Sequence, residues 1–260
     1  MQPAPLPRRP VRDRVARFGA LHLFRRPVRA RNARPIITFT FDDIDETAAS
    51  AGATVLERHG ARGTFYVAGS LCGARGENGR FASLDDCRAL AERGHEIGCH
   101  TYAHRAMRML TPAALDADLA RNADALAHAV SGHPLENFAL PYNAPTLRAK
   151  RLLSDRFTTC RGGQAGINQG LPDFAYLKSI EINDDDLSAA AAQGWIDRAV
   201  SANGWLIFFT HDIRAKRSRH GCTPRLFEDI VGRAVRSGAE VLTVRDAVRS
   251  IRGTDTRRPA

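Results

Sequence analysis

After residue 35 the chain alternates short apolar runs, typical of buried strands, with longer stretches of helical periodicity. The expected strands cover residues 36–41, 63–67, 95–99, 137–140, 156–160, 176–182, 205–210 and 239–243. The expected helices cover residues 46–59, 85–93, 112–130, 145–153, 188–202, 224–236 and 244–250. Helix ends are predicted at Gly60, Gly94 and Gly238, and a helix start at Thr111-Pro112. Repeated strand–helix units predict a parallel sheet, and about eight of them favour a distorted (β/α)7-8 barrel.

The barrel is expected to form one domain, because 260 residues with 43% apolar content suit a single α/β barrel. We assign residues 36–252 to this domain, 1–35 to a basic N-terminal arm and 253–260 to a C-terminal tail. Residues 161–175 are rich in Gly and lack periodicity, so they are expected to form a long loop over one end of the barrel.

The net charge of +10 belongs to the N-terminal arm, since residues 1–35 contain ten Arg and one Asp. Val11, Val15 and Phe18 share one helical face, which predicts a basic amphipathic helix. Such a helix can bind an anionic membrane surface or an acidic partner, and the alternative is a solvated arm. Nucleic-acid binding is not favoured, because no basic stripe with interleaved aromatic residues runs through residues 36–252.

The cysteines and the apolar runs predict a cytoplasmic location. The five cysteines are scattered and show no C-x-x-C spacing, which is typical of reduced thiols rather than a disulfide framework. The N-terminus has no apolar segment of the kind found in secretory signals. No apolar run is long enough to cross a bilayer.

Polar side chains with chemical potential follow the predicted strands, where the active sites of α/β barrels lie. After the successive strands stand Asp42-Asp43, His100 to His104, Pro141-Tyr142-Asn143, Arg161, Asn183 to Asp186, and His211-Asp212.

Two adjacent carboxylates such as Asp42 and Asp43 repel each other unless they share a cation or a proton. His100 and His104 have the spacing of two imidazoles that converge on one ion. Two His and one Asp leave coordination positions for water and substrate, and a metal held this way lowers the pKa of water and polarises a carbonyl. The second carboxylate can then accept a proton. His211 is either the donor to a leaving nitrogen or a core histidine.

Four short motifs resemble those of the NodB-homology polysaccharide deacetylases, carbohydrate esterase family 4. They are T-F-D-D (residues 40–43), H-T-x-x-H (100–104), P-Y (141–142) and the apolar run that ends in H-D (206–212). They occur in the family's order over about residues 36–250. Within the family the chain is most similar to short cytoplasmic deacetylases of bacterial exopolysaccharide clusters, of which a holdfast deacetylase is one example.

The resemblance implies removal of acetyl groups from N-acetylhexosamine (GlcNAc-type) units of an exopolysaccharide or of its lipid-linked precursor. It implies a divalent metal, Zn²⁺ above all, on Asp43, His100 and His104. Asp42 would be the general base and His211 the general acid. The Tyr142 backbone N–H would bind the oxyanion. The pocket for the acetyl group would be lined by the strand from Leu206 to Phe209 and by Leu140, with Pro141 in a substrate-binding or supporting position.

The chain departs from the family pattern at several positions. Ala139 stands where the family has the Arg that orients the catalytic Asp, and an Asp-Trp element is absent near Cys160-Arg161-Gly162. Our hypothesis is that Arg161 supplies the missing guanidinium to Asp42. Ile44 replaces a Gly after the paired aspartates.

The carboxylate partner of His211 is left open. The candidates are Asp184, Asp185, Asp186 and Asp212. The first three can equally be a cluster that caps the helix expected at 188–202.

Three other functions share some of these features. A hydrolase of a small amide or ureide would use the same barrel, with a lidded pocket under residues 161–175 instead of an open groove. An inactive glycan-binding domain is the second, although retention of Asp42 argues against it. Non-haem iron oxygenases use two His and one carboxylate, but on antiparallel double sheets that the strand–helix pattern contradicts.

Overall fold

The computed structural model describes residues 18–76, 79–130 and 134–253. Its main sheet has eight strands in the order β7-β6-β5-β2-β1-β9-β8, with β10 paired to β1, and all its ladders are parallel. The strands are β1 (Ile36–Asp42), β2 (Thr64–Val67), β5 (Glu96–Cys99), β6 (Asn137–Ala139), β7 (Thr159–Arg161), β8 (Ile180–Glu181), β9 (Trp205–Thr210) and β10 (Glu240–Val241). A separate antiparallel hairpin consists of β3 (Arg75–Gly76) and β4 (Gly79–Arg80).

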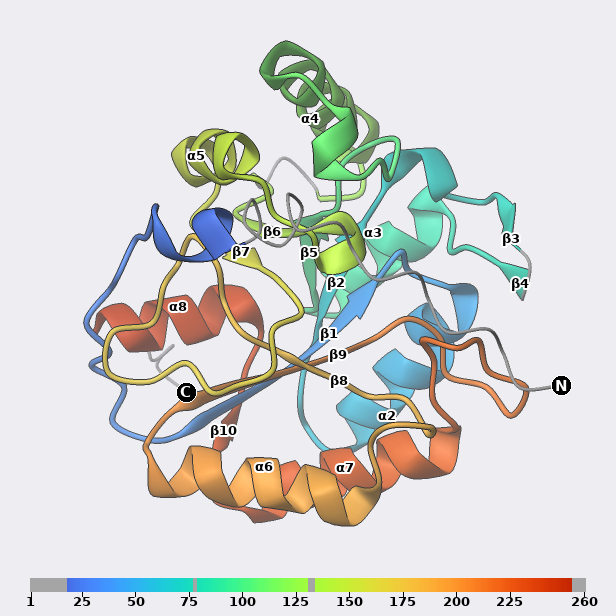
Figure 1. Cartoon of the computed structure of the whole chain (residues 1–260). Coiled ribbons are helices and arrows are strands. Elements are labelled where there is room, and N and C mark those ends of the chain that lie inside the picture. The colour runs from blue at the N-terminus through green and yellow to red at the C-terminus, as the bar shows by residue number, and fades with distance from the viewer. Residues whose placement is uncertain (1–17, 77–78, 131–133, 254–260) are drawn as a thin grey trace, which may run out of the picture.

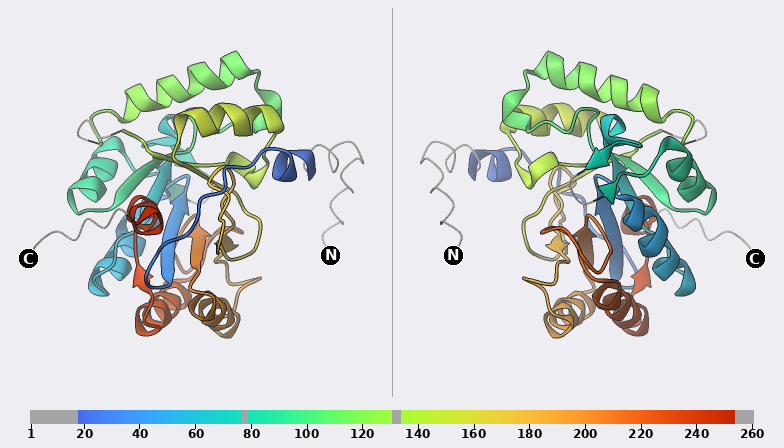
Figure 2. Two further views of the ribbon diagram at one scale, coloured as in Figure 1. Left: turned by 90° about the vertical axis from the view of Figure 1, so that its left-hand side faces the viewer. Right: turned by 90° about the vertical axis from the view of Figure 1, so that its right-hand side faces the viewer.

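Helices cover the outside of the curved sheet (Figures 1 and 2). They are α2 (Ala53–Arg58), α3 (Leu84–Glu92), α4 (Pro112–Leu126), α5 (Leu147–Arg156), α6 (Ala189–Ser201), α7 (Pro224–Arg236) and α8 (Val244–Arg252). The short elements are a π-helix, η1 (Ala48–Gly52), and the 3₁₀ turns η2 (Gly69–Leu71), η3 (Met107–Met109) and η4 (Pro141–Asn143). The α4–α5 pair and the α6–α7 pair pack at opposite ends of the view in Figure 1.

The sheet curls until its two edges meet. Leu177, just before β8, forms an isolated parallel bridge to Arg161 at the end of β7. The N–H of Gly162 donates to the carbonyl of Leu177 at 3.0 Å. The predicted distorted (β/α)7-8 barrel in a single domain is therefore confirmed.

The helix and strand limits match the sequence pattern to within two residues at most ends, with a few exceptions. The helix expected at 112–130 ends at Leu126, and the strand expected at 239–243 is a regular ladder only at Glu240–Val241. The strand expected at 156–160 begins at Thr159, because α5 continues to Arg156. The strand expected at 176–182 is a regular ladder only at Ile180–Glu181. The Gly-rich residues before it contain no helix or ladder strand, as expected for a long loop.

Side chains along β1 point alternately to the helices outside the barrel and to the barrel interior, and so contribute to two separate parts of the core. Phe39 and Phe41 pack in the cluster shared with α2, α6 and α7, whereas Ile36 packs with residues of the barrel interior and of α8. Inside the barrel, the Trp205 indole N–H donates to the Thr38 hydroxyl at 2.8 Å. All seven residues of β1 are buried, as is typical of a central parallel strand. Asp42 continues the interior row of every second residue.

The described part of the N-terminal region lies along the barrel. Ala20 is buried, and the Arg26 guanidinium donates to the carbonyls of Phe157 and Thr158 at 3.0 Å each. The predicted amphipathic helix falls largely outside the described residues, and the separate arm at 1–35 stays a prediction. No described helix has the length and apolarity that a membrane span requires.

Phe41→Ala is expected to lower the free energy of unfolding by about 3–5 kcal/mol, because truncation of a buried aromatic side chain leaves a cavity. The Phe41 ring is fully buried, stacks on Phe65 at 4.4 Å between centroids and contacts Phe227 at 5.7 Å. Urea unfolding followed by circular dichroism measures the change. Leu23→Ala, at a side chain that is 74% exposed, is the control with a change below about 0.5 kcal/mol. Equal effects of the two substitutions would contradict the core assignment.

Candidate metal centre and active site

The adjacent carboxylates at the end of β1 point to different partners. Asp42 is the last residue of the strand and is buried in the barrel interior. Asp43 has a φ of 60°, a left-handed conformation that turns the chain sharply after the strand. The turn lets Asp42 face Arg161 while Asp43 meets two imidazoles.

Asp43, His100 and His104 converge on one point, as the sequence predicted. Asp43 Oδ1 lies 3.3 Å from His100 Nε2 and 3.0 Å from His104 Nε2. The ligand atoms of the three residues lie within 4.8 Å of one another. Nevertheless, this buried carboxylate oxygen has no hydrogen-bond partner of acceptable geometry among the described residues. Three ligand atoms this close together form a group that could hold a cation.

The separations suit a divalent metal. Ligand atoms about 2.0–2.1 Å from a tetrahedral zinc lie about 3.3 Å from one another. His100 Nδ1 lies 2.9 Å from the carbonyl oxygen of Ala139, which can only accept a hydrogen bond. Nδ1 therefore carries the proton, and Nε2 keeps a lone pair for a metal, the outer-shell arrangement typical of zinc-binding histidines.

Electrostatics between these groups shift their pKa values in opposite directions. Burial alone would raise the pKa of Asp43, but the contacts and charges of His100 and His104 hold it well below the ordinary range. Burial alone would lower the pKa of His100, but the Asp43 contact and the charge of Asp42 raise it. A divalent cation at this place would stabilise the ionised form of Asp43 in the same way, whereas Asp42 is paired with Arg161.

Arg161 binds Asp42, as the sequence hypothesis placed it. The guanidinium is fully buried, and its Nη2 is paired with Asp42 Oδ2. Its Nη1 lies 3.3 Å from Asn143 Oδ1, and its charge faces the Phe209 ring at 4.6 Å. The other Asp42 oxygen, Oδ1, is buried and has no hydrogen-bond partner among the described residues. Asp42 is therefore held on one side and keeps an oxygen available for a proton.

The strand register explains how Arg161 reaches this place. Arg161 at the end of β7 is the direct Cα partner of Ala139 at the end of β6. Paired positions on neighbouring parallel strands project from the same face of a sheet. A guanidinium at 161 therefore enters the barrel from the strand next to that of Ala139, and the small Ala139 side chain leaves room for it.

Strained backbone conformations are concentrated in the loops around the candidate metal centre. Seven described residues other than Gly have positive φ, and six of them lie in the loops of this site: Asp43, Ile44, Thr101, His104, Tyr142 and Asn143. Such conformations cost energy and persist where the surrounding structure enforces them, most often at functional sites. Tyr142 is 62% exposed, and its ring lies 4.8 Å from that of His104.

His211 lies across a cavity from the metal-site carboxylate. The cavity has a volume of about 180 Å³ and is lined by Asp43, Asp45, Gly76, Gly79, Phe81, His211, Asp212, Ser218 and His220. Of its described lining residues, none comes from the 161–175 loop, so this loop does not cover the cavity. One cavity thus joins the candidate metal centre and the candidate acid.

The four aspartates considered as partners of His211 are engaged elsewhere. Asp184 accepts from the Thr223 N–H and hydroxyl, Asp185 pairs with Arg217 at 2.6 Å, and Asp186 accepts from Asn183 at 3.2 Å. Asp212 accepts from the Ser218 N–H at 2.9 Å. The carboxylate grouped with His211 is instead Glu181, together with His220.

Pro141 and Leu206, both expected from the sequence to contact or support the substrate, lie in different parts of the structure. Pro141 is buried and opens η4, directly before Tyr142. Leu206 is fully buried in the cluster that packs against the helices outside the barrel. Side chains alternate along β9, so Ile207 and Phe209, not Leu206, face the barrel interior.

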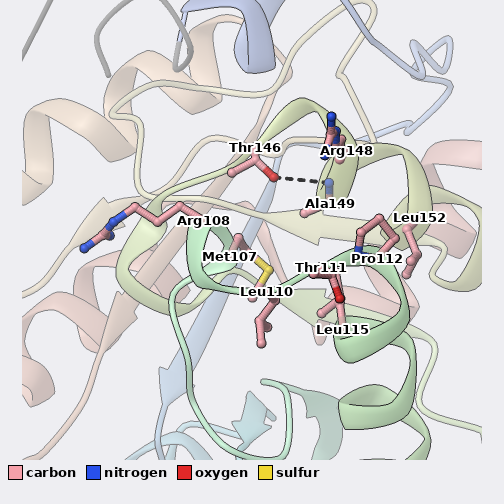
Figure 3. A pocket seen from close by; sticks show the side chains of 10 residues that line it. All are labelled: Met107, Arg108, Leu110, Thr111, Pro112, Leu115, Thr146, Arg148, Ala149 and Leu152. Carbon is pink, nitrogen blue, oxygen red and sulfur yellow. Dashed lines mark hydrogen bonds between the residues drawn. The ribbon is translucent and has the colours of Figure 1, made fainter. Parts of the chain in front are cut away.

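A second cavity of about 210 Å³ lies between η3, α4 and α5 (Figure 3). Its lining residues are Met107, Arg108, Leu110, Thr111, Pro112, Leu115, Thr146, Arg148, Ala149 and Leu152. In Figure 3 the Arg108 side chain extends away from the other lining residues. The cavity lining contains no carboxylate or imidazole among the described residues, so it is separate from the site chemistry.

Sequence reasoning missed Glu181 and His220 as members of the site. These two residues are 39 residues apart in the chain. The only sequence signal for Glu181 was its place at the end of a predicted strand. No spacing pattern marks His220, because it lies in a loop that returns to the cavity.

A comparison with protein families matches residues 29–155 to the model described as polysaccharide deacetylase. No curated protein matches the chain significantly. The matched region contains the Asp43, His100 and His104 cluster and Tyr142.

Solved structures share the fold over most of the chain. A putative polysaccharide deacetylase from Mycobacterium smegmatis is 14% identical with a TM-score of 0.62 and covers 89% of this chain and 99% of its own. A family 4 acetyl xylan esterase from Clostridium thermocellum, in complex with a cobalt ion, is 18% identical with a TM-score of 0.59, covering 84% and 92%. A family 4 pseudoenzyme from Bacillus anthracis is 13% identical with a TM-score of 0.56, covering 85% and 68%.

Proposed function

Since the chain belongs to the polysaccharide deacetylase family, we propose that it hydrolyses the acetamide of N-acetylhexosamine units with the help of a divalent metal. The observation that carries the proposal is the convergence of Asp43, His100 and His104 on one point beside Asp42. The substrate we propose is a bacterial exopolysaccharide or its lipid-linked precursor.

Asp43, His100 and His104 would hold the metal, and Zn²⁺ is the ion that we propose for this ligand set. When bound, the metal supplies Lewis acidity to the acetyl carbonyl and acidifies water. The buried Asp43 oxygen without a hydrogen-bond partner among the described residues fits a cation at this place.

Asp42 is the proposed general base. Its Oδ2 is anchored by Arg161, and its free Oδ1 can accept a proton from the attacking water. The ion pair with the buried guanidinium holds the carboxylate in a single orientation.

Tyr142 is the proposed hydrogen-bond donor to the carbonyl oxygen of the acetamide, and His211 is the proposed proton donor to its nitrogen. The Tyr142 backbone N–H would donate to the oxyanion, since its strained φ of 57° turns the peptide in the loop next to His104. His211 lines the same cavity as Asp43 and would donate a proton to the departing nitrogen. Of the strand expected to line the acetyl pocket, we retain Phe209, which faces the interior beside Arg161, and omit Leu206, which packs in the outer cluster.

The test of the substrate class is acetate release from N-acetylglucosamine oligomers in the presence of Zn²⁺. We expect kcat/KM for a tetramer or longer oligomer to exceed that for the monosaccharide by about tenfold or more, because additional sugar contacts contribute binding energy to the reaction. N-Acetylglycinamide serves as a small-amide comparison. Faster hydrolysis of the small amide than of any oligomer would overturn the carbohydrate assignment.

Contact of residues 1–35 with an anionic membrane surface stays a prediction. It rests on the ten Arg of this segment, and residues 1–17 lie outside the described part of the chain.

A further inference from the structure

A second cluster of titratable side chains lies at the cavity, next to the candidate metal centre. It consists of Glu181 from β8, His211 after β9, and His220 from the loop before α7, with one ligand atom of each within 4.8 Å of the others. The Nδ1 atom of His220 lies 2.8 Å from Glu181 Oε1. The imidazole rings of His211 and His220 are 5.2 Å apart.

The His220 backbone sets the orientation of His211. Its carbonyl oxygen lies 3.2 Å from both the main-chain nitrogen and the Nδ1 of His211. A carbonyl can only accept, so Nδ1 of His211 carries a hydrogen and Nε2 is the nitrogen left for exchange with a substrate. Among the described residues, His211 is therefore positioned by its hydrogen bond to the His220 carbonyl, and no hydrogen bond joins it to a carboxylate.

The His220 side chain itself also faces the reaction space. It lines the cavity with Asp43 and His211, and 56% of it is exposed. Hydrogen bonding to Glu181 raises the pKa of His220, and the charge of Asp43 acts in the same direction, against partial burial and Arg219. An imidazolium at this wall can donate a proton from Nε2, because its Nδ1 is engaged by Glu181.

We propose that His220, anchored by Glu181, is a second catalytic histidine that shares with His211 the protonation of the leaving amine. This inference rests on the proposed deacetylation. Water oxygen forms the bond to the acetyl carbon, and its proton goes to Asp42. The C–N bond then breaks with its electron pair on nitrogen, which takes one proton from His211 or His220. The products are the free amine and acetic acid, which carries the second hydrogen of the water and ionises to acetate in solvent. Solvent then returns a proton to the imidazole and removes one from Asp42.

The test compares substrates that differ in their need for an acid. An amine leaves only after protonation, whereas 4-nitrophenolate leaves from 4-nitrophenyl acetate without it. We expect His220→Gln to lower kcat on N-acetylglucosamine oligomers by about tenfold and to change aryl acetate hydrolysis by less than about threefold. The double variant with His211→Gln should lose about 10²–10⁴-fold on the oligomers, the range for complete removal of a general acid.

His59→Gln is the matched control, because His59 also pairs with a glutamate, Glu228, at 3.1 Å, but lies after α2 at the opposite rim of the barrel. It should leave both activities unchanged.

A second readout does not depend on turnover. In Glu181→Gln, NMR titration of labelled histidines should show a lower His220 pKa, since the remaining charged neighbours are Asp43, Arg219 and His211. The imidazolium is the active form, so the alkaline limb of the oligomer rate should move to lower pH.

Full oligomer activity in His220→Gln would overturn the inference while the proposed function stands, and so would equal losses on both substrates. An inactive wild type would overturn the proposed function and this inference with it.

Discussion

Asp42→Asn is expected to lower kcat for acetate release by about 10²–10⁴-fold, the effect of removing a general base. The amide is nearly isosteric with the carboxylate, but it cannot accept the proton of the attacking water. Asp42 is paired with Arg161 and does not belong to the group formed by Asp43, His100 and His104. Metal binding should therefore survive the substitution while turnover is lost.

The matched variant is Asp43→Asn, which changes the neighbouring carboxylate in the candidate metal site. Isothermal titration with Zn²⁺ should show binding in Asp42→Asn and a loss of about tenfold or more in affinity in Asp43→Asn. Chelation of the wild type should abolish acetate release, and added Zn²⁺ should restore it. Activity that survives both chelation and Asp42→Asn would refute the mechanism.

Arg161→Ala is expected to lower kcat by about 10²-fold, because a catalytic group displaced by about 1 Å can lose that much. The substitution leaves Asp42 buried without its cation, which costs about 3–5 kcal/mol of folding stability. Acetate release and urea unfolding, measured on the same preparation, give both effects. Arg161→Lys keeps the charge and loses the planar fork, so it should recover stability better than kcat.

The decisive variant moves the guanidinium to the neighbouring strand. Ala139 and Arg161 are direct partners in the β6–β7 ladder, so Ala139→Arg combined with Arg161→Ala offers Asp42 a cation from the adjacent position. We expect this double variant to be at least about tenfold more active than Arg161→Ala alone. Arg88→Ala, at an exposed ion pair with Asp85 within α3, is the control and should change stability by less than about 0.5 kcal/mol. Unchanged activity in Arg161→Ala would refute the positioning role.

The barrel and the candidate metal ligands were predictable because both depend on local patterns. The run Ile36 to Phe41 is apolar throughout except for two threonines and ends in carboxylates, which locates a buried strand and its exit. Parallel strands bring their carboxyl ends to one rim, so the positions of His100 and His104 after a predicted strand were enough to place them near Asp43. The start of α4 at Thr111-Pro112 and the helix ends at glycine residues were predictable in the same way, from local capping preferences.

The Arg161 pairing lay at the limit of sequence reasoning. Asp42 and Arg161 are separated by 119 residues. The pairing was suggested only by Ala139 at the family's Arg position and by Arg161 at the end of the next predicted strand. In the β6–β7 ladder Ala139 lies opposite Arg161. An Arg on β7 can therefore reach Asp42 as an Arg at position 139 on β6 would.

What the sequence by itself determined is therefore the succession of strands and helices, the place of Asp42 and Asp43 at the exit of a buried strand, and the rim where the ligands gather. These features follow from the periodicity of side chains and from the residue types at the ends of helices and strands, both of which are local in the sequence. Only the tertiary structure decided that Leu206 faces the outer helices, that the four candidate aspartates bind other groups, and that Glu181 and His220 stand beside His211. Those outcomes depend on where loops return across the barrel rim, and loop paths are set by long-range packing that no local pattern encodes.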